Sequence, residues 1–541
     1  MLSFSALLIF LCTVVLSTIT IAGVPYCLPG DKCFPSGTEL QVFNNSINGK
    51  LIKNEPYGSA CYKSNYNANI CMEQVTNKHS YPHQLSLPAG VMYTSWEQTE
   101  KGEGCPVPEL PANASPLSPL EGNCTLGGMS SYSVKTLAVD DITMTVKFAR
   151  KHNLRFRIKN TGHDYTGHVL AIGPGANVEE VYAAGARNGV VLAAGYTASV
   201  GAGGGYVLGG GIGPLGNYFG LAVDNVVQFD VVTADGSTET VNECTNPDLF
   251  WALRGGGGTL AVTTRTYFKT YPSFSAVSTA VGQIKCTQRS AWTTLITKLI
   301  ASQVSLRKAG LAGIWQSNSG TLSLALIYLQ PSFTNPATEL STFFNLIKPF
   351  LSIPSCATQV KPTQFVGNTS WNDAYRQAIL PLITAAAPGG LNIIDGSRLI
   401  SNKLVSSETE LRSVTDYVVN LDPNVNFIWQ NSVGTASNKI APNATSVHPD
   451  WRTAFAFMDI AVTGPWSGTT PSQISIAKKA LEDADSVFGE TAFSNEAWIL
   501  EKNWQRQFWG ENYERLVKIK RDVDPCGLFN CRRCVGSEEG F

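Results

Sequence analysis

The chain has 541 residues, of which 43% are hydrophobic and 15% are charged, a composition typical of a globular protein with more than one domain. Its formal net charge at pH 7 is −1 and it has no basic run, which argues against a nucleic-acid partner. Beyond its first residues, no segment is both apolar and long enough to span a bilayer, so no stable membrane insertion is expected.

Residues 1–23 contain an apolar run followed by small residues, which predicts a secretory signal peptide cleaved near Ala22–Gly23. An uncleaved anchor is the alternative, because the usual basic start is missing. Five Asn-x-Ser/Thr sequons occur, at Asn44, Asn113, Asn123, Asn368 and Asn443. Together with the signal they predict a secreted glycoprotein.

Cysteine usage agrees with secretion. Twelve of the 13 cysteines lie beyond the signal, and an even count in a secreted chain indicates disulfides, with connectivity left open. Six of them fall in residues 24–125, which have little periodic pattern, so this segment is predicted to be stapled by disulfides. Cys531 and Cys534 could form a redox or zinc pair, but no second pair or histidine lies nearby, which favours a disulfide.

Regular elements begin at residue 131. Residues 131–137 are strand-like, and residues 139–153 have helical spacing with acids early and bases late. Residues 154–160 alternate as a strand, so residues 160–168 should form the loop that ends a β-α-β unit. Loops at that edge of a sheet commonly bind ligands.

A second set of elements follows. We expect a helix at 177–189, a buried strand at 190–195 and a hairpin at 225–242 that turns at Asp235–Gly236. A helix at 246–258 and a strand at 260–272 should follow. Residues 275–500 change to longer helices and strands, which indicates a domain built as a sheet covered by helices. A last helix is expected at 512–525.

The run 201–216 holds nine glycines, and glycine lets backbone N–H groups approach a phosphate closely. Gly211, Gly213 and Gly216 match the dinucleotide fingerprint, but no clean amphipathic helix and no acidic strand end follow. A plain tight turn is the alternative, yet so many glycines would build a poor turn, which favours a phosphate-bearing ligand. The interpretation of the chain as an NAD-dependent dehydrogenase rests only on the fingerprint. It conflicts with secretion, because NAD is scarce outside cells.

The stretch "RIKNTGHDYTGH", residues 157–168, holds two of the chain's 6 histidines. His163 has three interpretations: a hydrogen-bonded structural histidine, a metal ligand, or a nucleophile that bonds an electrophilic cofactor. A metal site would need ligands beyond Asp164 and His168, and the sequence offers no further cluster, so no metal is expected.

Four motifs occur in order: "TGHD", "VGAGGGYVLGGGIGPLG", "DLFWALRGGGGT" and the run from Asn503 to Asn530. With them the chain, from about residue 27 onward, resembles the secreted FAD-linked oxidases of the vanillyl-alcohol-oxidase superfamily, in the fungal form of the berberine-bridge-enzyme-like branch. The resemblance implies an α+β fold, with a two-part PCMH-type FAD-binding domain and a substrate domain whose antiparallel sheet is covered by helices. The implied division begins with a signal peptide at 1–23 and a disulfide-stapled N-terminal segment at 24–125. The FAD-binding domain follows at 126–274 and the substrate domain at 275–500, and a C-terminal segment at 501–541 returns to the FAD domain.

The resemblance also implies FAD bonded to His163 through the flavin 8α-methyl group. Its other FAD-binding positions would be Asn160, Thr161, Gly162, Asp164, Thr197, Val200, Gly201, Gly203, Gly204, Gly209 and Gly210. Thr197 stands where many relatives carry a second flavin-bonding cysteine, so a single covalent link through His163 is expected.

Two further departures bear on activity. The segment between His168 and Gly195 is shorter than in the family, and Phe493 replaces the tyrosine of a Tyr-x-Asn-Glu motif. Asn495 and Glu496 therefore remain as the candidate catalytic residues, with Glu496 as a base, and a surface or hydrogen-bonded carboxylate is the alternative.

The function expected from the resemblance is that of a secreted, monomeric oxidase of a small alcohol, sugar or amine such as an alkaloid. Hydride would pass to flavin N5, and O2 would reoxidise the flavin to give H2O2. The alternative is a secreted flavin- or carbohydrate-binding homologue with weak or no catalysis, which the shortened segment and Phe493 suggest.

Overall fold

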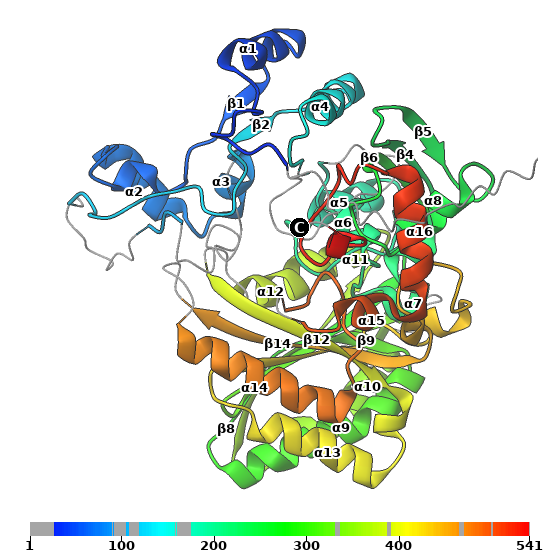
Figure 1. Ribbon diagram of the computed structural model, residues 1–541. Helices are drawn as coiled ribbons and strands as arrows, with labels where there is room; N and C mark the ends of the chain where they lie inside the picture. The colour runs from blue at the N-terminus through cyan, green and yellow to red at the C-terminus, as the bar shows by residue number, and fades with distance from the viewer. Residues whose placement is uncertain are drawn as a thin grey trace, which may run out of the picture.

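The computed structural model describes residues 26–88, 90, 104–107, 118–156, 158, 175–330, 336–386, 391–464, 470–498 and 501–539. Its largest element is a seven-stranded antiparallel sheet of order β11-β8-β10-β9-β13-β14-β12 (Figure 1). The strands are β8 Ala276–Cys286, β9 Leu311–Asn318, β10 Thr321–Gln330, β11 Cys356–Val366, β12 Asn392–Ser401, β13 Val425–Gln430 and β14 Ala454–Gly464.

Helices cover one face of this sheet, and Figure 1 shows several of them beneath it. They are α9 Arg289–Lys308, α10 Pro336–Leu351, α13 Glu408–Asn420 and α14 Pro471–Phe488. The core between the two layers includes Trp315 and Trp429, which are fully buried and stack with ring centroids 5.5 Å apart. The predicted sheet covered by helices is therefore confirmed, because alternate residues of the inner strands bury their apolar side chains against the helices.

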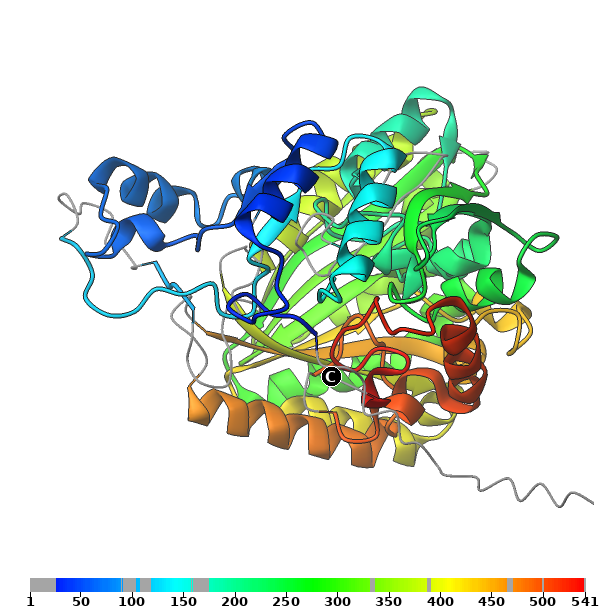
Figure 2. The same cartoon turned by 45° about the horizontal axis from the view of Figure 1, so that its top comes forward.

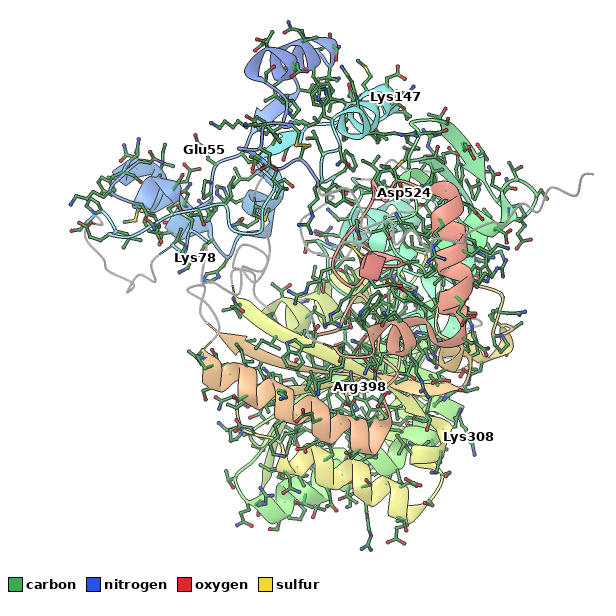
Figure 3. The ribbon with its side chains drawn as sticks, viewed as in Figure 1. Glu55, Lys78, Lys147, Lys308, Arg398 and Asp524 are labelled. Carbon is green, nitrogen blue, oxygen red and sulfur yellow. A yellow bond between two sulfur atoms is a disulfide. The ribbon has the colours of Figure 1, made fainter. Side chains whose placement is uncertain are left out.

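A buried cation fixes α14 to the edge of the sheet. Arg398 of β12 lies between the sheet and this helix (Figure 3), with its side chain 1% exposed. Its Nε donates to Asp485 of α14 at 2.6 Å, and its Nη1 donates to Glu501 at 2.8 Å. The segment that follows α14 is thus held close to β12.

The opposite face of the sheet packs against a second group of elements. These are α5 Val178–Arg187, β3 Val190–Val191, α6 Gly205–Leu208, α7 Gly216–Phe219, β4 Val226–Val232, β5 Thr238–Val241, α8 Pro247–Leu253, β6 Val262–Phe268 and β7 Tyr271–Pro272, with α11 Ser370–Ala374, α12 Leu380–Ala386, α15 Trp504–Trp509 and α16 Tyr513–Val523. One continuous core joins them to the sheet through Val277, Ile314, Ala325, Leu399 and Phe457.

Most elements predicted before the sheet are present. The hairpin forms between β4 and β5, and Gly236 adopts the positive φ of 83° that its turn requires. Of the strand predicted at 154–160, Leu154 and Phe156 form single bridges, to Cys27 and Phe529, and residues 157, 159 and 160 lie outside the described residues. The buried strand expected at 190–195 is reduced to β3.

The N-terminal elements form a lobe beside the rest of the molecule (Figure 2). They are α1 Gly37–Ser46, β1 Leu51–Lys53, α2 Ala68–Asn77, α3 Tyr81–Ser86 and β2 Tyr132–Val134. Helix α4 Val139–Lys151 joins this lobe to the rest, because Phe148 stacks on Phe43 of α1 while Val146 and Ala149 pack against β4 and β6. The predicted stapling is confirmed by Cys27–Cys33, Cys61–Cys71 and Cys105–Cys124.

Two more disulfides lie outside the N-terminal lobe. Cys286–Cys356 joins β8 to β11, and Cys531–Cys534 confirms the disulfide interpretation of that pair. Cys244 and Cys526 are exposed free thiols, so the even cysteine count does not mean that every cysteine is paired. In the portion of the chain that the structure covers, no helix has the length and apolarity needed to cross a membrane.

Candidate active site

The first half of the glycine run is held in place by short backbone contacts. Val178 donates its N–H to the Val200 carbonyl at 2.9 Å, and Gly201 forms a bridge with Asn177. The Gly203 carbonyl accepts a hydrogen bond from Thr266 Oγ1 at 2.6 Å. The candidate cofactor residues from 197 to 210 therefore lie in one segment, which contains α6 and ends in the turn that follows this helix.

Several glycines in the run are needed for contact with other parts of the protein. A Cβ at Gly209 would lie 2.2 Å from Asn495 Oδ1, and a Cβ at Gly216 would lie 1.9 Å from the Ser432 carbonyl oxygen. Gly210 has a φ of +130°, which a residue with a side chain rarely adopts. Part of the glycine pattern thus serves close packing against the segments after β13 and α14, which the sequence did not predict.

The loop expected to carry the flavin bond lies outside the described residues. This applies to Asn160, Thr161, Gly162, His163 and Asp164, and also to His168.

Three carboxyl groups meet on the sheet face opposite the helices. Asp459 of β14 pairs with Ser397 of β12, and Asp395 lies two residues earlier on the same face of β12. Glu496 arrives from the segment after α14, where Ser397 Oγ accepts the Phe493 N–H at 3.0 Å. The Glu496 N–H in turn donates to the Phe493 carbonyl at 2.9 Å, which directs Glu496 toward the sheet.

The carboxyl groups of Glu496 and Asp459 share a hydrogen bond. Burial, followed by the charge of Asp395, raises the pKa of Glu496 to about 8. Burial and the charges of Glu496 and Asp395 raise the pKa of Asp459 well above its usual value. Two carboxyl groups can hydrogen-bond only if one holds a proton, so the pair is expected to keep at least one proton near neutral pH.

The surroundings of the pair support this protonation state. Glu496 is half-buried as a residue, but its Oε2 atom is buried, as is Asp459 Oδ1. Neither oxygen has a donor partner among the residues with described positions, which leaves the shared proton to satisfy them. Glu496 is therefore a hydrogen-bonded carboxyl group rather than a surface one, which agrees with one form of the alternative, and its role as a base stays a prediction.

A chain of hydrogen bonds leads from this pair to Tyr196, which precedes the candidate cofactor residues 197–210. Gln430 Nε2 donates to Asp459 Oδ2 at 2.8 Å, and Ser432 Oγ donates to Gln430 Oε1 at 3.5 Å. The hydroxyls of Ser432 and Tyr196 lie 2.8 Å apart. Burial raises the pKa of Tyr196, so its hydroxyl stays protonated, and Tyr196 directly precedes Thr197 in the chain.

Asn495 and Phe493 both fix the position of the segment that carries Glu496, and a catalytic role of Asn495 stays a prediction. Asn495 Nδ2 donates to the Gly205 carbonyl at 2.9 Å, so this amide ties the Glu496 segment to α6. Phe493 is 2% exposed, and its ring meets Trp451 and Phe457 edge-on at 5.4 and 5.8 Å. An apolar cage thus surrounds the ring of Phe493.

The sequence reasoning missed Asp459, Asp395 and Gln430. A signal for the two acids was present, because each is a single carboxylate inside an apolar strand, in "AFAFMDIAVTG" and "LNIIDGSRLI". Strands buried on one or both faces rarely carry an unpaired acid, so such a residue marks a functional candidate.

Comparison with known proteins identifies the class of protein to which this fold and site belong. Two family models match the chain, a FAD binding domain at residues 164–242 and berberine and berberine like at residues 492–535. An uncharacterized FAD-linked oxidoreductase of Arthroderma benhamiae is 30% identical, with 95% of this chain and 94% of the relative covered. The chain belongs to the berberine-bridge-like FAD-linked oxidoreductases.

Solved structures agree with this assignment. The crystal structure of the VAO-type flavoprotein MtVAO615 from Myceliophthora thermophila C1 is 25% identical, with a TM-score of 0.77 and coverage of 95% of this chain and 98% of that one. Glucooligosaccharide oxidase from Acremonium strictum, described with a 6-S-cysteinyl, 8α-N1-histidyl FAD, shares the fold at 20% identity. Its TM-score is 0.59, with 74% of this chain and 90% of that one covered.

The described residues fit a FAD. The Ser199 hydroxyl is buried between Thr197 and Gly201 and has no hydrogen-bond partner among the residues that the structure describes. A buried hydroxyl without a partner is costly in a folded protein, and a polar ligand beside this segment would satisfy it.

Proposed function

We propose that the protein is an extracellular FAD-dependent oxidase of a small organic alcohol, sugar or amine. The observation that supports this most directly is the Asp459–Glu496 carboxyl pair, which hydrogen bonds connect to the cofactor segment beside Thr197. When bound, FAD supplies the acceptor for the substrate hydride and passes the electrons to O2, which gives H2O2.

The residues of the chain handle the proton in this reaction. The ionised member of the carboxyl pair accepts the O–H or N–H proton of the substrate, while the protonated member stabilises the remaining charge. Gln430 holds Asp459 in place through its 2.8 Å hydrogen bond. Asn495 acts as a positioning residue, because its amide donates to a carbonyl of α6.

We also propose a single covalent bond between FAD and His163. A threonine hydroxyl does not form the thioether that a cysteine would, so Thr197 leaves the histidine as the one attachment point. Secretion and glycosylation belong to the same proposal. The disulfides support secretion, and the sequons at Asn123, Asn368 and Asn443 lie on exposed residues.

The test is to purify the secreted protein and measure its spectrum and its H2O2 production with alcohols, sugars and amines. The proposal expects a flavin spectrum and peroxide with at least one compound, at a rate that depends on Glu496. The second candidate, a binding homologue without catalysis, is favoured by the apolar cage around Phe493. Bound flavin with no peroxide and no flavin bleaching across the panel would support that candidate.

A further inference from the structure

A single buried ammonium group joins the C-terminal helix α16 to two other parts of the chain. Lys520 of this helix is 6% exposed, and Asp524, which follows the helix in Figure 3, is 3% exposed. Lys520 Nζ donates to the Thr259 carbonyl at 2.7 Å and to the Phe529 carbonyl at 2.6 Å. It also donates to the Asp524 carboxylate, so all three N–H donors of the ammonium group are used. We call these four residues the Lys520 cluster.

One side of the Lys520 cluster leads to the segment that carries His163. The Asp524 carboxylate accepts the N–H groups of Leu528 and Phe529 at 2.8 and 2.9 Å, which fixes the turn after α16. Phe529 then forms a bridge with Phe156, and the two rings lie 5.8 Å apart. Residues 157–168, which include His163, come directly after Phe156 in the chain. The cluster therefore holds the chain at the point where this segment begins.

The other side of the Lys520 cluster leads to the candidate cofactor residues 197–210. Thr259 directly follows a second glycine run, residues 255–258. Gly257 of this run donates its N–H to the Leu208 carbonyl of α6 at 2.9 Å. One ammonium group thus connects the glycine-rich segment to the start of the His163 segment, although the two lie in different parts of the sequence.

We propose that Lys520 is a positioning residue for the attachment of the flavin. By holding the Thr259 and Phe529 carbonyls on one ammonium group, it sets the distance between the cofactor segment and the start of the His163 segment. Apolar side chains of similar volume would stabilise this region as well as a buried ion pair does, but they would not fix the two carbonyls in direction and distance.

Flavin attachment depends on such positioning. The reaction removes one hydrogen from the imidazole and one from the 8α-methyl group and forms an N–C bond, and the two protons and two electrons reduce O2 to H2O2. The bond forms only when its two atoms are held close together, so a small displacement of either segment should lower its yield strongly. The inference rests on the proposed attachment through His163.

Two measurements on the purified full-length protein test the role of Lys520. They are the share of flavin that stays with the protein after acid precipitation and the rate of deuterium uptake in residues 148–156. We expect Lys520→Met to lower the covalently bound share at least about 3-fold and to raise the exchange rate about 10-fold.

Arg398→Met is the matched control. Arg398 is also a buried cation that bonds two carboxylates, those of Asp485 and Glu501, but its hydrogen bonds reach neither the cofactor segment nor residues 148–156 within the part of the chain that the structure describes. This variant should lower the melting temperature by a similar amount and change neither measurement.

A second variant separates positioning from lost stability. Lys520→Met leaves the Asp524 carboxylate buried without its cation, and adding Asp524→Asn removes that charge while the amide oxygen still accepts an N–H group. The double variant should regain most of the melting temperature. Its covalent share should stay low, because the link between Thr259 and Phe529 is still missing.

The outcomes distinguish this inference from the proposed attachment itself. Flavin that acid releases even from the parent protein overturns the attachment through His163, and with it the role of Lys520. Flavin retained equally by the parent and both Lys520 variants overturns the role of Lys520 alone. The same holds if Arg398→Met changes both measurements to the same extent, or if the double variant recovers the covalent share together with its melting temperature, because lost stability would then be the cause.

Discussion

Asp459 of β14 and Glu496 of the segment after α14 hydrogen-bond to each other through their carboxyl groups. The two residues come from different elements and meet because Ser397 holds the Glu496 segment against β12. Their shared proton and the raised pKa of Glu496, about 8, make the pair suited to accept and release a proton near neutral pH.

Replacing either carboxyl group should slow substrate oxidation strongly. We expect Glu496→Gln and Asp459→Asn each to lower the rate of anaerobic flavin reduction about 10²- to 10⁴-fold, the usual contribution of general base catalysis. The double variant should be little worse than the slower single variant, because the pair acts as one unit. Stopped-flow absorbance measures the rate, and Glu408→Gln on the exposed surface of α13 is the control. Independent, multiplicative effects would argue against a shared proton.

The same pair predicts how stability depends on pH. The pKa of Glu496 is raised from 4.5 to about 8, so between these values the folded protein holds a proton that the unfolded chain has released. The free energy of unfolding should therefore fall as pH rises through this window, by up to about 1.4 kcal/mol per unit from this group. Urea unfolding at pH 5, 6.5 and 8 measures the slope, and Glu496→Gln should flatten it. An identical slope in the variant would show that other groups cause it.

The proposed flavin bond predicts a simple chemical difference. Acid precipitation should leave the yellow colour with the parent protein, whereas His163→Ala should release it into the supernatant. Thr197→Ala should behave as the parent, because a threonine makes no second bond. Mass spectrometry of the flavin-bearing peptide identifies the attachment residue directly. Colour retained by His163→Ala would place the bond elsewhere or make the proposal wrong.

Gly209 should be intolerant of any side chain. Its Cβ would lie 2.2 Å from Asn495 Oδ1, so Gly209→Ala should push Asn495 away and cost about 1–3 kcal/mol of unfolding free energy. The flavin content should fall as well, because Asn495 ties α6 to the catalytic segment. Gly37→Ala is the matched control, since a Cβ there meets no atom within 4 Å. Partial rescue by adding Asn495→Ser to Gly209→Ala would identify the clash as the cause.

A buried ion pair should contribute strongly to the free energy of unfolding, because it connects the residues after the glycine run to those just before β14. Arg452 and Asp224 form two hydrogen bonds of 2.8 Å, and both side chains are 2% exposed. Arg452→Met should destabilise the protein by about 3–5 kcal/mol, because it leaves the Asp224 charge buried without a partner. Thermal or urea unfolding measures the loss. Arg412→Ala, which breaks the exposed pair with Glu408, should cost less than about 1 kcal/mol.

The sequence by itself determined the local elements, the family resemblance and the class of cofactor. Helical spacing in α4, α5 and α16 and the Asp-Gly turn of the β4–β5 hairpin depend on residues close together in the chain, so their pattern is readable without a fold. The stapled N-terminal segment and the Cys531–Cys534 disulfide are local in the same sense.

Only the tertiary structure decided which acids form the candidate site. Asp395, Asp459 and Glu496 are far apart in the chain, and their pKa values depend on burial and on one another's charges, which exist only once β12, β14 and the segment after α14 are packed together. Strand register, not chain order, likewise places Asp459 beside Ser397, the residue that holds the Glu496 segment.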